Sequence, residues 1–387
     1  MIEQELPDRR LHVCLVSAAY HPYPSGVSEH VRHLALALKE LGQDVHVLTT
    51  NYPGKQDNVD PFPVTRLGRV VLVPANRSYA TVPVGLRLAG QVKRFFAGNR
   101  FDVVHCHGMF WPEISYWAIR HSEAVHLVTF LTAGFKIRTR GAGLFRTLFA
   151  GQLRRIDGLV PISNRAWQAF QTYVPGKPRI IPCGVDLDRF RPDQEPLSPK
   201  GRPTVLFLGR LDGRKGICVL LRAMPFVLAE MPEARLVVVG TGPEETRARK
   251  LCRELGVADA VEFAGRKPGA ELPRYYADCD VYCSPALGGE TLGIVLLEAM
   301  ASGAPVVCSN IPGYDETVED GKNGILFPPG DHKTLAATLV KVLQDDALRR
   351  DLVRNGLERA KQYSWARVAG RTLGYYRELL ASRPNAR

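Results

Sequence analysis

Apolar residues in the first half of the chain follow two different spacings. Strand-length apolar runs occur at Leu11–Ser17 and Val45–Thr49, and between them Ser28–Leu41 places apolar residues at helical intervals before Gly42 ends the pattern. A strand, a glycine-containing loop, a helix and a second strand form the opening of a Rossmann-type βαβ unit. The pattern therefore predicts an α/β fold.

The same two spacings continue to the C-terminus. Further strands are predicted at 70–73, 101–107, 125–130, 158–163, 203–208, 235–240 and 305–308, and further helices at 84–96, 164–173, 294–300 and 365–380. Residues 190–203 are rich in Pro and charged residues, which is typical of a linker between two domains.

Composition limits the kind of protein. The chain has 387 residues, of which 45% are hydrophobic and 23% are charged, so it is long enough for two domains with complete cores. Apolar runs are of strand length, and residues 1–11 carry acids without an apolar core, so we expect neither a membrane span nor a secretory signal. The eight cysteines are scattered without zinc-type pairs, which favours reduced thiols in a cytoplasmic protein.

Positive charge is concentrated in the first half. The net charge is +12, and residues 1–190 carry 23 Lys and Arg against 14 Asp and Glu. Between Glu123 and Asp157 there is no acid, while the basic residues there are Lys136, Arg138, Arg140, Arg146, Arg154 and Arg155. Such a surface attracts phosphates or an anionic membrane, although a solvated basic face is the alternative. The chain has no recognition motif for nucleic acid.

The predicted helix 84–96 is amphipathic. Leu88, Val92 and Phe95 share one face, and Arg87, Gln91 and Arg94 share the other. Basic residues beside paired aromatic residues suit a membrane interface, but packing of the apolar face in the core explains the pattern equally well.

The stretch 286–303 carries the strongest chemical signal. Gly288 and Gly289 precede Glu290, and the apolar helix 294–300 contains a second acid, Glu298. The N–H groups of Thr291, Leu292 and Gly293 would lie at the helix N-terminus, which favours an anion. Eight helical residues span about 12 Å, near the length of a nucleotide diphosphate sugar. The alternative is a core helix with two solvating acids, but an unpaired Glu298 in an apolar run would be costly.

Other candidate residues follow predicted strands. Arg210 and Lys215 flank the loop after strand 203–208, where a guanidinium and an ammonium suit a diphosphate leaving group; solvated loop charges are the alternative. Gly26 lies where the backbone could approach a diphosphate, and a plain turn explains it equally well. His105 and His107 share one face of a strand, but a metal site there lacks a third ligand.

These motifs resemble those of the retaining glycosyltransferases of family 4. The Glu290–Glu298 spacing matches that family's E-x7-E motif, and ADCDVYCSPALGGETLGIVLLEAMASGAPVV (277–307) is most similar to phosphatidylinositol mannosyltransferases. The resemblance implies the GT-B fold, in which two Rossmann-like domains face a cleft. It places an N-terminal acceptor domain at 1–193, a C-terminal donor domain at 194–363, and a C-terminal helix, 364–387, that crosses back to the first domain.

The resemblance also implies roles for individual residues. Arg210 and Lys215 would stabilise the departing nucleotide diphosphate, Glu290 would orient the sugar, Glu298 would hold the ribose, and Gly26 would face the diphosphate. Arg266 lies in the loop that contacts the base in the family. The acid expected there for guanine is not evident in residues 266–270, so a GDP-sugar and a UDP-sugar both remain open. The remaining implied contacts are Leu131 and Thr132 for the sugar, and Asn76, Ser78, Arg87, Lys93 and Arg94 for the membrane and acceptor.

Leu131 departs from the family at a position near the donor sugar. Leu131 occupies the place of a histidine that meets the donor sugar near its C6 hydroxyl, and leucine donates no hydrogen bond.

The expected function is transfer of a sugar, with retention and without a metal or other cofactor, to an anionic lipid at the inner membrane face. We expect a peripheral protein there. The alternatives are a small soluble acceptor and a non-catalytic nucleotide-sugar-binding protein.

Overall fold

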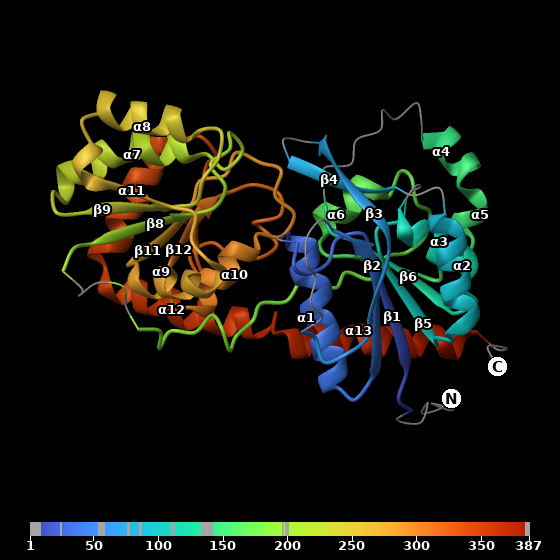
Figure 1. Ribbon diagram of the computed structural model, residues 1–387. Helices are drawn as coiled ribbons and strands as arrows, with labels where there is room; N and C mark the ends of the chain where they lie inside the picture. Colours follow the sequence, from blue (N-terminus) through green and yellow to red (C-terminus); the bar gives the residue numbers. More distant parts are fainter. Residues whose placement is uncertain are drawn as a thin grey trace. The chain divides into compact units, whose positions relative to one another are not determined.

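The computed structural model describes residues 9–23, 25–52, 59–75, 78–84, 87–109, 113–132, 142–195, 197 and 201–383. The chain forms two compact units: unit 1 comprises residues 1–184 and 365–387, and unit 2 comprises residues 185–364 (Figure 1). The sequence placed the first boundary after residue 193, whereas residues 185–193 group with unit 2. Phe190 is buried there, with its ring 5.9 Å from that of Tyr276.

Unit 1 contains a seven-stranded sheet in the order β4-β3-β2-β1-β5-β6-β7. Its strands are β1 (His12–Ser17), β2 (Asp44–Asn51), β3 (Val64–Ala75), β4 (Ser78–Val84), β5 (Val103–His107), β6 (Val125–Phe130) and β7 (Gly158–Pro161). All neighbouring pairs are parallel except β3 and β4. In β1, Val13 and Leu15 enter one apolar cluster while Cys14 and Val16 enter another, so the sheet is buried on both faces.

Helices cover both faces of this sheet. One layer consists of α1 (Gly26–Glu40) and α13 (Trp365–Ser382), which pack against each other. The described helices of the remaining part of unit 1 are α2 (Leu88–Gly98), α3 (Ile114–His121), α4 (Ala142–Leu148), α5 (Ala150–Leu153) and α6 (Asn164–Phe170). This doubly wound arrangement is that of a Rossmann-like domain.

The segment predicted as helix 84–96 is divided between two elements. Val84 ends β4, and α2 begins at Leu88. Leu88 and Val92 are buried, and the rings of Phe95 and Phe96 pack around Phe101, so the apolar face of α2 contributes to the core. The backbone of Ser78 lies in β4. Asn76, Lys136, Arg138 and Arg140 lie outside the described residues.

The C-terminal helix α13 is joined to unit 1 by polar contacts. The Tyr376 hydroxyl lies 2.7 Å from Nδ1 of His105, and the Arg179 guanidinium makes two hydrogen bonds to the Glu378 carboxylate. The other ring nitrogen of His105 lies 2.6 Å from the Thr129 hydroxyl, and its ring stacks on that of His107. The H-x-H pair therefore lies in the core beneath α13.

Unit 2 contains a six-stranded sheet in the order β10-β9-β8-β11-β12-β13, in which neighbouring strands are parallel. The strands are β8 (Thr204–Leu208), β9 (Arg235–Val239), β10 (Val261–Gly265), β11 (Val281–Ser284), β12 (Val306–Ser309) and β13 (Ile325–Phe327). Figure 1 shows α7 (Ile217–Glu230), α8 (Glu245–Glu254) and α11 (His332–Gln344) on one face, and α9 (Leu272–Asp278), α10 (Ile294–Ala301) and α12 (Asp346–Lys361) on the other.

Buried histidines make unit 1 sensitive to acid. Burial lowers the pKa of His107 from 6.5 to about 4, and it also lowers the pKa values of His30 and His105. Below about pH 6.5 the unfolded chain therefore binds protons that the folded chain does not. The contribution of these histidines to the free energy of unfolding is fully present above about pH 6.5 and is lost as the pH falls toward 4. At pH 4 the loss from His107 alone is about 3 kcal/mol.

We predict that the thermal unfolding midpoint of the full chain falls less between pH 6.5 and pH 4 in His107→Leu than in the wild type, as measured by calorimetry. His12→Asn, at an exposed position, is the control and leaves the profile unchanged. If the midpoint of His107→Leu falls as steeply with decreasing pH as that of the wild type, His107 is not a source of the acid sensitivity.

Candidate active site

The candidate site lies at the carboxyl edge of the sheet in unit 2. From β8 the chain passes to β9 on one side, and β11 later pairs with β8 on the other side, so the strand order reverses between β8 and β11. Ligands of open parallel sheets bind outside the carboxyl ends of the strands at such a point. Two loops leave the sheet here, residues 209–216 after β8 and residues 285–293 after β11.

These two loops are in direct backbone contact. The N–H of Leu287 donates a hydrogen bond of 2.7 Å to the carbonyl of Arg214. Gly216 has a φ of +70°, and a Cβ atom there would lie 1.8 Å from the carbonyl oxygen of Pro285. Glycine is therefore required at position 216 both by its backbone conformation and by the close approach of the second loop.

Lys215 and Glu290 meet across the loops. The Lys215 ammonium lies 2.9 Å from Oε1 of Glu290, and the side chains are only 19% and 12% exposed. Low exposure weakens solvent screening of this ion pair. Arg210 lies in the same loop as Lys215, and its side chain is exposed. The structure thus brings together a cation and an acid that the sequence had placed 75 residues apart.

Asp212 and Arg214 support the first loop, and neither was singled out from the sequence. The buried Asp212 carboxylate accepts hydrogen bonds from the backbone N–H of Arg214 at 2.9 Å and of Lys215 at 3.3 Å, and from the Arg214 guanidinium at 3.0 Å. An Asp side chain that accepts from the N–H two residues on is typical of a tight turn. The Asp-Gly pair at 212–213 was the available sequence signal.

The E-x7-E segment is only partly helical. Residues 290–293 form a loop, Gly293 has a φ of +77°, and α10 begins at Ile294, so the N–H groups of Thr291 to Gly293 precede the helix. The eight residues from Glu290 to Glu298 are therefore not one continuous helix. Glu298 is half-buried in α10, and its Oε2 accepts a hydrogen bond of 3.0 Å from the Tyr276 hydroxyl.

The other predicted residues belong to other segments of the chain. Arg266 is exposed in the loop after the edge strand β10 of unit 2. In unit 1, Gly26 is the first residue of α1, and a Cβ atom there would meet nothing within 4 Å. Leu131 is half-buried and Thr132 is exposed, directly after β6.

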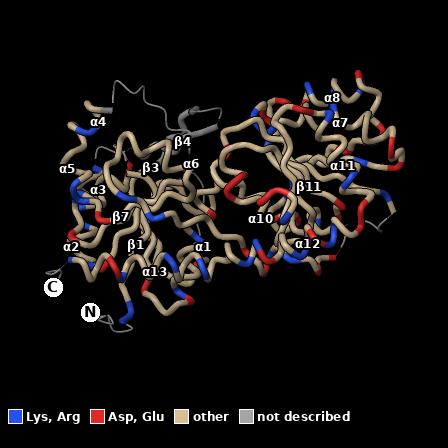
Figure 2. The backbone as a smooth tube through the Cα atoms, turned by 180° about the vertical axis from the view of Figure 1, so that it is seen from behind, with Lys and Arg blue, Asp and Glu red and all other residues tan. Residues whose placement is uncertain are grey.

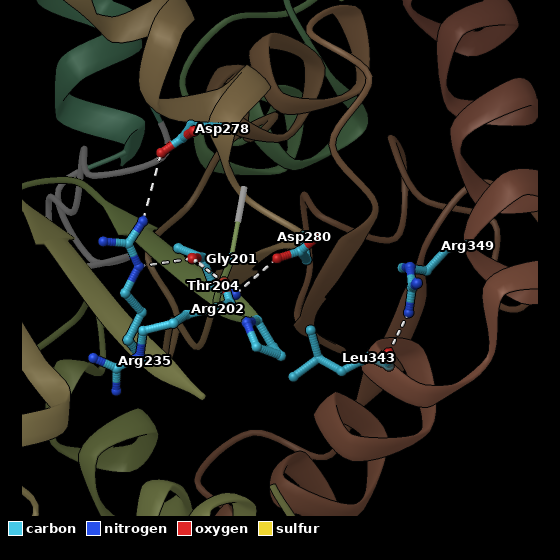
Figure 3. A pocket seen from close by; sticks show the side chains of 9 residues that line it. Gly201, Arg202, Thr204, Arg235, Asp278, Asp280, Leu343 and Arg349 are labelled. Carbon is cyan, nitrogen blue, oxygen red and sulfur yellow. Dashed lines mark hydrogen bonds and ion pairs between the residues drawn. The ribbon is translucent and has the colours of Figure 1, made fainter. Parts of the chain in front are cut away.

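A cavity of about 220 Å³ lies at the opposite, amino-terminal edge of the sheet in unit 2 (Figure 3). Its charged side chains have partners within the chain. The Arg235 guanidinium donates to the Thr204 hydroxyl and lies 3.7 Å from Asp278, while the Asp280 carboxylate accepts from the N–H of Thr204 and Arg349 donates to the carbonyl of Leu343. This network fixes the starts of strands β8 and β9 and is separate from the candidate site.

The described part of the chain contains neither a cluster of metal-ligating side chains nor a membrane-spanning helix. Among the described residues, no three or more His, Cys, Asp or Glu side chains gather as they would around a metal ion. None of the described helices is long and apolar enough to cross a membrane.

Family models match both halves of the chain. Residues 24–189 match the model described as Glycosyltransferase Family 4, and residues 188–359 match the model described as Glycosyl transferases group 1. The phosphatidyl-myo-inositol mannosyltransferase of Mycobacterium leprae is 35% identical over 366 residues, which cover 93% of this chain and 94% of that protein. The D-inositol 3-phosphate glycosyltransferase 2 of Catenulispora acidiphila is 35% identical, with 91% and 89% covered.

Solved structures show the same fold. Sucrose-phosphate synthase from Thermosynechococcus elongatus superposes with a TM-score of 0.74 at 26% identity, covering 96% of this chain and all of that one. HepE of Anabaena, solved with UDP and glucose, superposes with a TM-score of 0.71 at 18% identity, covering 95% and 99%. The fold and the relatives define the protein as an enzyme, a glycosyltransferase of the GT-B class. Within that class, the chain belongs to glycosyltransferase family 4.

Proposed function

We propose that the enzyme transfers a sugar, with retention, from a nucleotide diphosphate sugar to an acceptor that carries an inositol phosphate. The observation that carries the proposal is the Lys215–Glu290 pair at the carboxyl edge of β8 and β11. A cation suited to phosphate and an acid suited to sugar hydroxyls lie side by side, next to the N–H groups that precede α10.

Each residue has a role in the proposed reaction. Arg210 and Lys215 stabilise the charge that develops on the departing diphosphate, and the N–H groups near Leu292 add to this. Glu290 orients the sugar, and Glu298 holds the ribose of the donor. Arg266 and Gly26 remain donor contacts by resemblance, facing the base and the diphosphate. No described carboxylate is assigned as a nucleophile, so stabilisation of the leaving group is the main source of rate acceleration.

The acceptor is proposed from the names of two relatives. One acts on phosphatidyl-myo-inositol and the other on D-inositol 3-phosphate, and both acceptors contain an inositol phosphate. The first is a lipid at a membrane, whereas the second is a small soluble molecule. We favour the lipid because unit 1 carries a strongly basic surface.

This surface, which we call the outer helical surface, lies on α2, α3 and the residues after α5. Its cations are Arg87, Lys93, Arg94, Arg120, Arg154 and Arg155. Figure 2 shows Lys and Arg along these elements. Burial lowers the pKa of His121, and the nearby cations Arg120, Lys93 and Arg155, which come from separate elements, lower it further. Because Phe95 and Phe96 pack in the core, we propose that contact with an anionic membrane at the inner face is electrostatic.

The donor sugar is proposed from Leu131. In the resembling enzymes a histidine at this position meets the C6 hydroxyl, and an unpaired buried hydroxyl costs about 1–3 kcal/mol. We propose that Leu131 favours a pentose or a 6-deoxyhexose over a hexose. Thr132 is the alternative hydrogen-bond partner for a hexose.

Lys215→Ala is expected to lower the rate of sugar transfer about 100-fold or more, because it removes a charge-assisted contact to the leaving group. Initial rates are measured with GDP- and UDP-sugars and with phosphatidylinositol. Lys250→Ala, on α8, is the control and retains full activity. Transfer by Lys215→Ala near the wild-type rate would remove Lys215 from the mechanism.

Reversal of the charges of Lys93 and Arg94 to Glu is expected to weaken binding to anionic vesicles at least tenfold, since each cation near such a surface contributes about 1 kcal/mol. Sedimentation with vesicles containing phosphatidylinositol measures the binding, which also weakens with added salt. Lys333→Glu with Lys341→Glu makes the same charge change on unit 2 as a control. Equal binding to neutral vesicles would contradict electrostatic docking.

Competition between donors with the same nucleotide tests Leu131. In the wild-type enzyme a 6-deoxy or pentose donor is expected to give a higher kcat/KM than its hexose counterpart. The substitution Leu131→His is expected to shift this preference toward the hexose donor. A clearly higher kcat/KM for the hexose in the wild-type enzyme would contradict the assignment.

A further inference from the structure

Glu298 occupies an unusual position for a carboxylate. It lies in α10, whose sequence is IVLLEAMA, and the neighbouring residues Leu297 and Ala299 are fully buried. A carboxylate in such surroundings is costly to bury unless it is hydrogen-bonded. The Tyr276 hydroxyl of α9 donates to Oε2 of Glu298 at 3.0 Å and meets part of this requirement.

Tyr276 is held rigidly. Its side chain is fully buried, and its ring packs edge-on against Tyr282, with ring centroids 5.3 Å apart, and against Phe190 at 5.9 Å. Burial raises the pKa of the Tyr276 hydroxyl, and the Glu298 carboxylate raises it further. The hydroxyl therefore stays protonated at neutral pH and can donate its hydrogen bond to Glu298.

We propose that Tyr276 is a positioning residue that fixes the orientation of the Glu298 carboxylate for the ribose of the donor. The inference rests on the proposed function, in which Glu298 accepts hydrogen bonds from the ribose hydroxyls. A carboxylate that is ordered in the folded protein binds a diol without first losing rotational freedom. Tyr276 thereby contributes to the affinity for ribose without touching the nucleotide.

The matched substitution removes a single oxygen atom. Tyr276→Phe keeps the ring and its packing, and Tyr282→Phe is the control, because the Tyr282 ring lies in the same cluster but its hydroxyl donates to the carbonyl of Leu208. Binding of UDP and GDP to the full-length protein, each beside its 2′-deoxy and 3′-deoxy counterparts, is measured by calorimetry. The deoxy nucleotides report whether the site remains intact in each variant.

In the wild type the ribose form is expected to bind about tenfold more tightly than the deoxy forms, which lack a hydrogen bond to a charged group. Tyr276→Phe is expected to weaken binding of the ribose form about five- to tenfold and to leave the deoxy forms unchanged, so that the preference for ribose is largely lost. Tyr282→Phe keeps the wild-type preference.

The outcomes separate the inference from the proposed function. If Glu298→Gln abolishes the preference for ribose and Tyr276→Phe retains it, the inference is overturned and the proposed role of Glu298 stands. If Tyr276→Phe weakens ribose and deoxy nucleotides equally, Tyr276 is structural and the inference is overturned. If Glu298→Gln also retains the preference, or if neither UDP nor GDP binds the wild type, the proposed donor site itself fails.

Discussion

The close contact between the loops after β8 and β11 is the constraint on which the candidate site depends. Parallel strands end at one edge of the sheet, so the pairing of β8 with β11 places the loops side by side. Gly216 lets the backbones approach, since any Cβ atom there would collide with the carbonyl of Pro285. Lys215 precedes this glycine directly, so the 2.9 Å distance to Glu290 depends on the same contact. The geometry of the candidate site therefore depends on strand order and one glycine.

Local spacing made some of these residues candidates from the sequence alone. The Arg210–Lys215 and Glu290–Glu298 spacings each lie within a few residues, and a motif of that length is visible in one chain. The Lys215–Glu290 pair was not predictable in this way, because it depends on which strands are neighbours. Tyr276 was missed for the same reason, since it meets Glu298 only because α9 packs against α10. In the sequence, nothing distinguishes Tyr276 from any other aromatic residue of the core.

The fold shows the same division between local and distant information. Apolar periodicity identified β1, β2, β5, β6, β7, β8, β9 and β12 and the helix before β2. It did not identify the buried strand β11 or the antiparallel pairing of β3 with β4 that places Val84 in a strand. The amphipathic pattern of α2 could not reveal what covers its apolar face. His46, whose ring packs edge-on against Phe95, comes from β2, in a distant part of the chain. What remains exposed on α2 is the charge of Lys93 and Arg94, which explains why a docking surface there would be electrostatic.

The ion pairs of unit 2 bear on how the diphosphate and the sugar of the proposed donor would bind. Arg214 is paired with the buried Asp212, and Lys215 is paired with Glu290, whereas Arg210 makes no ion pair with any described residue. Under the proposed function, a diphosphate first meets the exposed guanidinium of Arg210. The Lys215 ammonium has three N–H donors, so it can contact a phosphate oxygen while it keeps its interaction with Glu290. The Glu290 carboxylate has further lone pairs that can accept from sugar hydroxyls, so under the proposed function Lys215 connects the diphosphate directly to the acid that orients the sugar.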